Sequence, residues 1–151
     1  MAEKTVRLAG PEDAAAVGEL VRSAYSKYVG LIGKEPAPML DDYAALIRVG
    51  EVWVLDEGGE MLGALVKRAA REHLFVDNMV VAPGHQGRGL GRKLMAFAEE
   101  RARREGLGEV RLYTNEKMRE NLAVYAKLGF EETGRGLGGG YRRVFMRKRL
   151  P

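Results

Sequence analysis

The chain has 151 residues, of which 46% are hydrophobic and none is cysteine. This length supports one hydrophobic core, so we expect a single domain over residues 1–151, and the lack of cysteine excludes disulfides and cysteine nucleophiles. Two histidines, His73 and His85, do not make a zinc site, and the formal net charge of +4 is mild. With no membrane-spanning apolar run of about 18 residues and no signal-peptide profile, we expect a cytoplasmic protein without a metal.

Hydrophobic periodicity predicts a strand and two helices in the first third of the chain. Residues 4–9 alternate as a short strand, and Pro11 opens a helix that runs towards Tyr28. A loop dense in glycine and proline follows over 29–38, and a second helix covers about 39–48.

The remaining pattern predicts a hairpin, two further helices and four further strands. In chain order these are strands at 51–56, 60–69 and 73–81, a helix at about 88–105, a strand at 109–114, a helix at 117–128, and strands at 130–133 and 141–148. The order is βααβββαβαββ with no internal repeat.

The most informative segment is the glycine-rich stretch between the strand at 73–81 and the following helix. Glycines stand at 84, 87, 89 and 91, directly before the helix. Such a turn exposes backbone N–H groups where the helix dipole is positive, which favours an anion. The spacing fits neither the nucleotide P-loop, since no Lys-Ser/Thr pair follows, nor the dinucleotide fingerprint, since Arg92 replaces its third glycine.

A second glycine cluster at 134–139 matches the dinucleotide fingerprint letter for letter. The residues after it are strand-like, however, so the helix that this fingerprint requires is missing. We therefore expect a flexible loop between two late strands.

The string Gln86-x-x-Gly89-x-Gly91 resembles the signature loop of the GNAT superfamily of acetyl-CoA-dependent N-acetyltransferases. The resemblance covers nearly the whole chain and is sharpest at 79–95 and 115–130. It implies an α/β (α+β) fold with a mixed, mostly antiparallel sheet and helices on both faces. It also implies that acetyl-CoA is bound and that a primary amine of a small molecule or protein accepts the acetyl group.

The resemblance assigns the binding of the cofactor to two segments. The residues concerned are Met79, Val80, Val81, Gln86, Gly87, Arg88, Gly89, Leu90, Gly91, Arg92, Asn115, Asn121 and Tyr125. Asn121 and Tyr125 are four residues apart on one helix and therefore share a face. Tyr125 stands ahead of Lys-Leu-Gly-Phe130, where the superfamily carries a tyrosine that protonates the leaving thiolate as general acid.

The general base and the acceptor site are less sharply indicated. Asp77 and, as an alternative, His73 lie on one face of the strand before the signature loop, where family members often place a base. The resemblance places the acceptor near Tyr28, Tyr43, His73 and Tyr141.

Two other function classes remain open from the sequence. One is a GNAT-like acyl-CoA-binding sensor without turnover. The other is a basic nucleic-acid-binding domain, which the acids Glu99, Glu100 and Glu105 among the arginines of the 88–105 helix disfavour. GNAT proteins are often dimers, so a homodimer is also open.

Overall fold

A computed structural model describes residues 3–151 of the chain. Its strands are β1 (Lys4–Leu8), β2 (Val52–Glu57), β3 (Glu60–Ala69), β4 (His73–Val81), β5 (Glu109–Asn115), β6 (Glu131–Gly138) and β7 (Tyr141–Arg149). Its α-helices are α1 (Ala14–Tyr25), α2 (Val29–Ile32), α3 (Tyr43–Arg48), α4 (Leu90–Arg104) and α5 (Arg119–Lys127). Single 3-10 turns stand at Pro11–Asp13, Ser26–Tyr28, Ala37–Leu40 and Pro83–His85.

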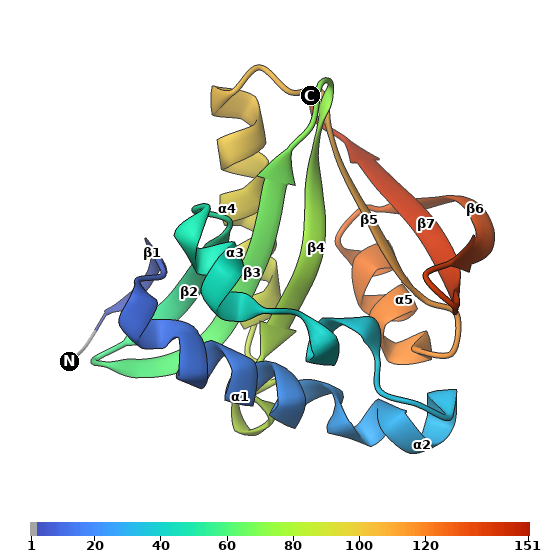
Figure 1. Cartoon of the computed structure of the whole chain (residues 1–151). Helices are drawn as coiled ribbons and strands as arrows, with labels where there is room; N and C mark the ends of the chain where they lie inside the picture. Colours follow the sequence, from blue (N-terminus) through green and yellow to red (C-terminus); the bar gives the residue numbers. More distant parts are fainter. Residues whose placement is uncertain (1–2) are drawn as a thin grey trace. The chain divides into compact units, whose positions relative to one another are not determined.

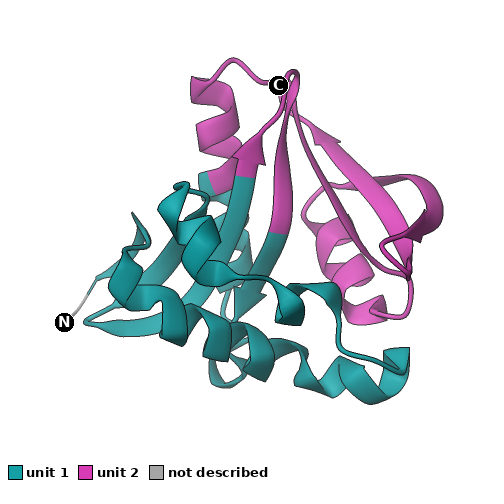
Figure 2. Ribbon diagram, viewed as in Figure 1, with its two compact units in different colours: residues 1–67, 78–97 teal, residues 68–77, 98–151 magenta. Residues whose placement is uncertain are grey.

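The strands follow the order β1-β2-β3-β4-β5-β7-β6 in a seven-stranded mixed sheet (Figure 1). Strands β4 and β5 pair in parallel, whereas the β1–β2, β2–β3, β5–β7 and β6–β7 pairs are antiparallel. The expectation of a mixed, mostly antiparallel sheet is therefore confirmed. The chain forms two compact units, one from the described residues through 67 together with 78–97, the other from 68–77 and 98–151 (Figure 2).

In the first unit, helices lie on both faces of β2 and β3. Alternate side chains of a strand point to opposite faces, and Val52 and Val54 are fully buried on one of them. On the other face, the ring of Trp53 lies 4.9 Å from that of Phe97 on α4. Figure 1 shows α1 and α3 on the opposite side of these strands from α4.

In the second unit, β5 pairs with β7 along its whole length, and one face of the two strands is buried. Leu112 and Val144 lie on this face, with 2% and 0% of their surface exposed. Lys148 of β7 reaches Glu99 of α4 at 3.1 Å, so this is the helix-covered side. The odd-numbered residues of β7 point the other way.

The second glycine cluster differs from its expectation. Residues 131–138 form a full strand, β6, which pairs with β7 with a register shift between Glu132 and Gly134, and only Gly139 and Gly140 make the turn, with φ of 59° and 83°. The loop prediction was wrong because glycine has no side chain to give a strand pattern, whereas the backbone hydrogen bonds to β7 need none.

The segment between the first two predicted helices also differs from its expectation. The predicted helix from Pro11 is divided at Ser26, and a single α-helical turn, α2, stands where a loop was predicted. Gly33 ends that turn with a φ of 91°, the left-handed conformation that glycine adopts without a Cβ clash.

Candidate active site

The signature loop has the backbone geometry expected of an anion-binding turn. It connects the end of β4 at Val81 to the start of α4 at Leu90. Gly87 and Gly89 have φ of 79° and 80°, in the region that L side chains avoid. These two residues turn the chain into α4, whose first N–H groups have no partners within the helix and lie at the positive end of its dipole.

Side chains of the loop hold it against the sheet. The Gln86 side chain donates a hydrogen bond to the Val81 carbonyl at 3.1 Å, so it closes the turn back onto β4. His85 Nε2 lies 3.3 Å from a carboxylate oxygen of Glu60, while His85 Nδ1 lies 3.0 Å from the Arg88 guanidinium. A neutral ring protonated on Nε2 satisfies both contacts, since it donates to Glu60 and accepts from Arg88. His85 therefore stiffens the loop.

The predicted cofactor residues of this unit separate into exposed and buried groups. Arg88 and Arg92 are exposed and place positive charge around the turn, whereas the Leu90 side chain is buried and leaves only its backbone at the surface. Gly91 is half-buried, and a Cβ there would contact Met79 at 3.6 Å. The loop thus offers backbone donors and arginines to a pyrophosphate.

Strand β4 approaches β3 closely where the loop begins. A Cβ on Gly63 of β3 would lie 2.8 Å from the Val80 carbonyl oxygen, a contact that real side chains do not make. Glycine at 63 therefore allows the backbone around Val80 to take its position. Val80 is buried and Val81 is half-buried.

The two candidate bases stand at different points along β4. They share a half-buried face of the strand with Phe75. At about 3.3 Å per residue, four residues separate His73 from Asp77 by roughly 13 Å, so one amine cannot contact both. Asp77 forms an ion pair with Arg68 at 3.1 Å. Burial, followed by the charge of Arg111, lowers the pKa of His73, which favours its neutral form.

The candidate general acid lies on α5 in the second unit. Tyr125 is 6% exposed, and its ring meets the ring of Phe130 edge-on at 5.8 Å. Asn121, one turn earlier, is half-buried and donates to the Met118 sulfur at 3.6 Å. Asn115, at the end of β5, accepts a hydrogen bond from the Lys117 N–H at 2.9 Å and so caps the turn before α5.

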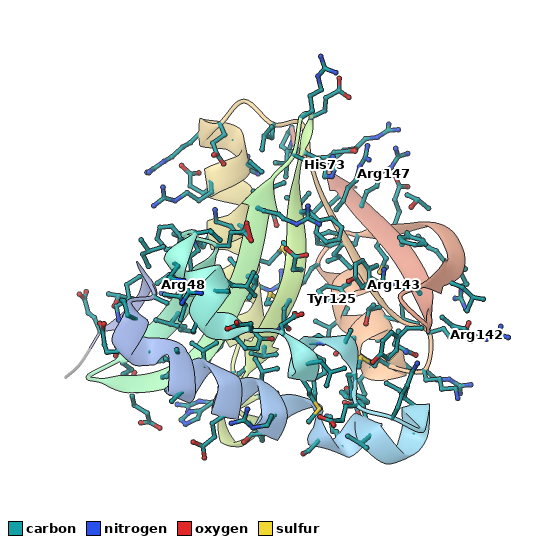
Figure 3. The ribbon with its side chains drawn as sticks, in the orientation of Figure 1. Arg48, His73, Tyr125, Arg142, Arg143 and Arg147 are labelled. Atoms are coloured by element: carbon teal, nitrogen blue, oxygen red, sulfur yellow. The ribbon has the colours of Figure 1, made fainter. Side chains whose placement is uncertain are left out.

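The four residues predicted to line the acceptor site lie in different parts of the chain. Tyr28 and Tyr43 are buried in the first unit, at 7% and 6% exposure. His73 and the half-buried Tyr141 belong to the second unit, where they begin β4 and β7. Figure 3 labels His73, Tyr125 and three arginines of β7.

Sequence reasoning missed Asn78, which organises a buried polar network in the first unit. It accepts a hydrogen bond from the Tyr25 hydroxyl at 2.8 Å and donates one to the Tyr43 hydroxyl at 2.9 Å. Tyr43 in turn donates to the Pro38 carbonyl at 2.6 Å. The signal that could have revealed Asn78 is an amide between the apolar residues Val76 and Val80 of β4.

Residues 3–151 hold neither a cluster of metal ligands nor a membrane-spanning helix. No group of three or more His, Asp or Glu there is arranged to hold a metal ion. No helix in the same residues is long and apolar enough to cross a membrane.

The signature loop between β4 and α4, together with the strand order of the sheet, indicates the class of protein. The sequence model of the GNAT acetyltransferase family matches residues 17–130, three quarters of the chain. The protein belongs to that family and is therefore an acetyltransferase by descent and fold.

Individual relatives give the same class. The chain is 29% identical to the N-acetyltransferase YjgM of Escherichia coli, over 84% of its own length and 81% of that protein. It is 33% identical over 78 residues to the streptothricin acetyltransferase of Streptomyces lavendulae and 29% identical over 91 residues to N-acetyltransferase family 8 member 2 of Rattus norvegicus. Those two alignments span 41% and 40% of the relatives, so the chain matches less than half of each.

Solved structures share the fold over the whole chain. The PaiA N-acetyltransferase of Thermoplasma acidophilum, crystallised with coenzyme A, superposes with a TM-score of 0.82 at 16% identity and covers 98% of this chain and 99% of its own. YncA of Salmonella typhimurium, solved with acetyl-CoA, gives a TM-score of 0.74 at 23% identity, covering 99% and 95%.

Proposed function

We propose that the protein transfers the acetyl group of acetyl-CoA to a primary amine of a small molecule or protein. The observation that carries this proposal is the turn at Gly87 and Gly89, both with positive φ, which leads directly into α4, whose first N–H groups have no partners within the helix. Exposed Arg88 and Arg92 beside that turn suit a pyrophosphate, which coenzyme A carries.

Each residue of the proposed site has a defined task. Acetyl-CoA supplies a thioester whose carbonyl carbon an amine attacks. Backbone N–H groups at Val80 and Val81 stabilise the negative charge that develops on the carbonyl oxygen. The Tyr125 phenol protonates the departing sulfur. Asn121 and Asn115 orient the pantetheine arm, a role that rests on the family resemblance.

Asp77 is our candidate for the general base. A base must accept the proton of the attacking amine directly or through one water. The Arg68 guanidinium holds the Asp77 carboxylate in place but also occupies part of it, so an entering amine competes with Arg68. His73, whose lowered pKa keeps it neutral and able to accept a proton, is the alternative.

We further propose that residues 1–151 work as one N-acetyltransferase domain in the cytoplasm. Light scattering on the purified protein tests the homodimer that the family resemblance leaves open. In a dimer, the scattering mass is twice the 16.7 kDa of the chain.

Thermal unfolding tests the cofactor first. Acetyl-CoA at a hundredfold excess over its Kd stabilises the folded state by about 2.7 kcal/mol, which raises the Tm of a chain of this length by about 5 to 10 °C. Gly89→Ala, at a φ of 80°, weakens this shift because alanine is strained there. Gly84→Ala is the matched control, since its Cβ meets no atom within 4 Å and its φ is not positive.

Turnover is then measured as thiol release from acetyl-CoA across a broad panel of primary amines. Release that depends on an amine supports the enzyme. A clear Tm shift with no release from any amine contradicts turnover and leaves an acyl-CoA-binding sensor. The absence of both overturns the proposed function.

A further inference from the structure

One face of the sheet in the second unit carries a row of aromatic rings. It is the face opposite the one on which Lys148 reaches α4. The ring of Phe75 on β4 lies 5.6 Å from that of Tyr113 on β5, which lies 6.2 Å from that of Phe145 on β7. Phe145 is 37% exposed, and Phe75 and Tyr113 are half-buried. The row is therefore an apolar shelf open to solvent at the β7 end.

Arginines flank this shelf, and most of them already have a carboxylate partner. Arg68 lies over Phe75 at 4.8 Å and pairs with Asp77. Arg111 pairs with Glu109 on its own strand, and Arg147 pairs with Glu131 of β6 at 3.0 Å. These pairs neutralise the charges at the edges of the shelf.

Arg143 differs from these arginines. Its guanidinium carbon lies 3.9 Å from the centre of the Tyr113 ring, stacked on the middle of the shelf. Within residues 3–151 it forms no ion pair with a carboxylate, and its buried Nε has no hydrogen-bond acceptor. Figure 3 shows Arg143 and Arg147 on β7.

An arginine in this condition is costly unless an acceptor reaches it. The side chain is half-buried, but its Nε–H is fully buried, and a buried donor without an acceptor loses its hydration and gains nothing in return. Glycine at 138, the last residue of β6, leaves room for the guanidinium, since a Cβ there would lie 2.6 Å from Arg143 Nη1. Stacking fixes the guanidinium plane, which prepares it for two parallel hydrogen bonds to one anion.

The charge of the unit favours the same kind of ligand. Residues 68–77 and 98–151 contain fifteen Lys and Arg against ten Asp and Glu, a formal net charge of +5. The first unit has ten against eleven, a net charge of −1. The field around the shelf therefore attracts anions and repels polycations.

We propose that the acceptor is an amine that also carries a carboxylate, which Arg143 binds while Tyr113 and Phe145 contact its apolar part. This inference rests on the proposed acetyl transfer and names the substrate class for it. Amino acids with an apolar or aromatic side chain have this chemistry. Polyamines and other amines without an anionic group do not.

Matched pairs of amines test the substrate class. Thiol release from acetyl-CoA is measured for phenylalanine, phenylalaninamide and phenethylamine, and for leucine, leucinamide and isopentylamine. We expect kcat/KM for the carboxylates to exceed that of their neutral or decarboxylated counterparts by about 10- to 100-fold, the range for a charge-assisted hydrogen-bonded pair. Spermidine serves as the polycationic comparison.

Variants then test the residue. Arg143→Met should raise KM for the carboxylates about 10- to 100-fold, with less effect on the amides and on the acetyl-CoA Tm shift. Arg143→Lys should recover part of the loss, because it keeps the charge but not the planar fork. Arg142→Met is the matched control. Arg142 is the exposed neighbour of Arg143 on the other face of β7 and lies 3.7 Å from Glu116, so its replacement should leave KM unchanged.

The outcomes separate this inference from the function on which it rests. A higher kcat/KM for the amides, the decarboxylated amines or spermidine overturns the carboxylate inference and leaves acetyl transfer standing. An unchanged KM for the carboxylates in Arg143→Met does the same. No turnover and no acetyl-CoA shift overturns both.

Discussion

Tyr125 has the surroundings of a group held in one orientation. Its ring is 6% exposed and packs against Phe130, the residue that follows the glycine at the end of α5. The Phe130 N–H donates to the Tyr125 carbonyl at 3.0 Å, so the backbone at the helix end is fixed as well. A proton donor gains from such order, because a fixed phenol spends little entropy in reaching the reacting atom.

Replacing Tyr125 by phenylalanine removes the proton donor and keeps the ring. We expect kcat for acetyl transfer to fall by about 100-fold or more, the usual contribution of a general acid. The Tm shift with acetyl-CoA should stay within about 1 to 2 °C of wild type, since the ring packing is retained. Full activity in this variant would show that another group, or water, protonates the sulfur.

Among the elements, β3 and β4 could be predicted to the residue from the sequence. Burial alternates along β4, β3 has an apolar run from Leu62 to Val66 at its centre, and turns bound the two strands at Gly58–Gly59 and before His73. The signature loop could be located for the same reason, since a strand and a helix enclose it. Strand β6 could not be predicted, because three of its eight residues are glycine and its pairing partner β7 comes later in the chain.

The candidate site could be predicted less completely than the elements. Gly87, Gly89 and Tyr125 stand in motifs whose spacing is local. The roles of Asn78 and Arg143 depend on contacts with residues distant in the chain. Asn78, for example, lies 53 residues after its partner Tyr25 and 35 after Tyr43. No local pattern distinguishes Arg143 from Arg142, since only the pleat of β7 directs them to opposite faces.

The close approach of β3 to β4 gives a prediction at the scale of these strands. Gly63→Ala places a methyl group 2.8 Å from the Val80 carbonyl, so the two strands must separate. We expect a loss of about 1 to 3 kcal/mol in the free energy of unfolding, as for other overpacked sites. The Kd for acetyl-CoA should rise as well, because the N–H groups near Val80 move.

Gly30→Ala in α2 is the control, since its Cβ meets nothing within 4 Å. It should leave both quantities near wild type. If Gly63→Ala destabilises the protein but binds acetyl-CoA as tightly as wild type, the strand approach serves folding alone.

For the molecule as a whole, the match to the family over residues 17–130 includes segments of both compact units. Their stability against acid depends partly on Asp13 at the entry to α1. Arg7 donates to both of its carboxylate oxygens, at 2.8 and 3.0 Å, and the Gly10 N–H donates at 2.8 Å. The hydrogen bond from Arg7 is the main reason why the pKa of Asp13 lies below its ordinary value.

A carboxyl whose pKa is lower in the folded state stabilises the fold above its unfolded pKa of about 3.9 and loses that effect as pH falls through its folded pKa. Asp13→Asn should therefore cost about 1.5 to 3 kcal/mol at pH 7 and progressively less as pH falls from about 5 towards 2. Urea unfolding across this range measures it. Glu12→Gln removes an exposed neighbouring carboxyl and is the control: its free energy of unfolding should follow that of wild type across this pH range. A cost for Asp13→Asn that does not change with pH would contradict the linkage to this carboxylate.

The buried network around Asn78 has a direction as well as a geometry. The Pro38 carbonyl can only accept a hydrogen bond, so the Tyr43 hydroxyl donates its single proton to it. The Tyr43 oxygen must therefore accept the hydrogen bond from Asn78. The amide of Asn78 is then oriented with its oxygen towards Tyr25, whose hydroxyl donates to it. All three protons point along one path, from α1 through β4 to the segment before α3, and each bond polarises the next. The carbonyl of the half-buried Pro38 thus fixes the donor-to-acceptor direction of all three hydrogen bonds in the interior of the first unit.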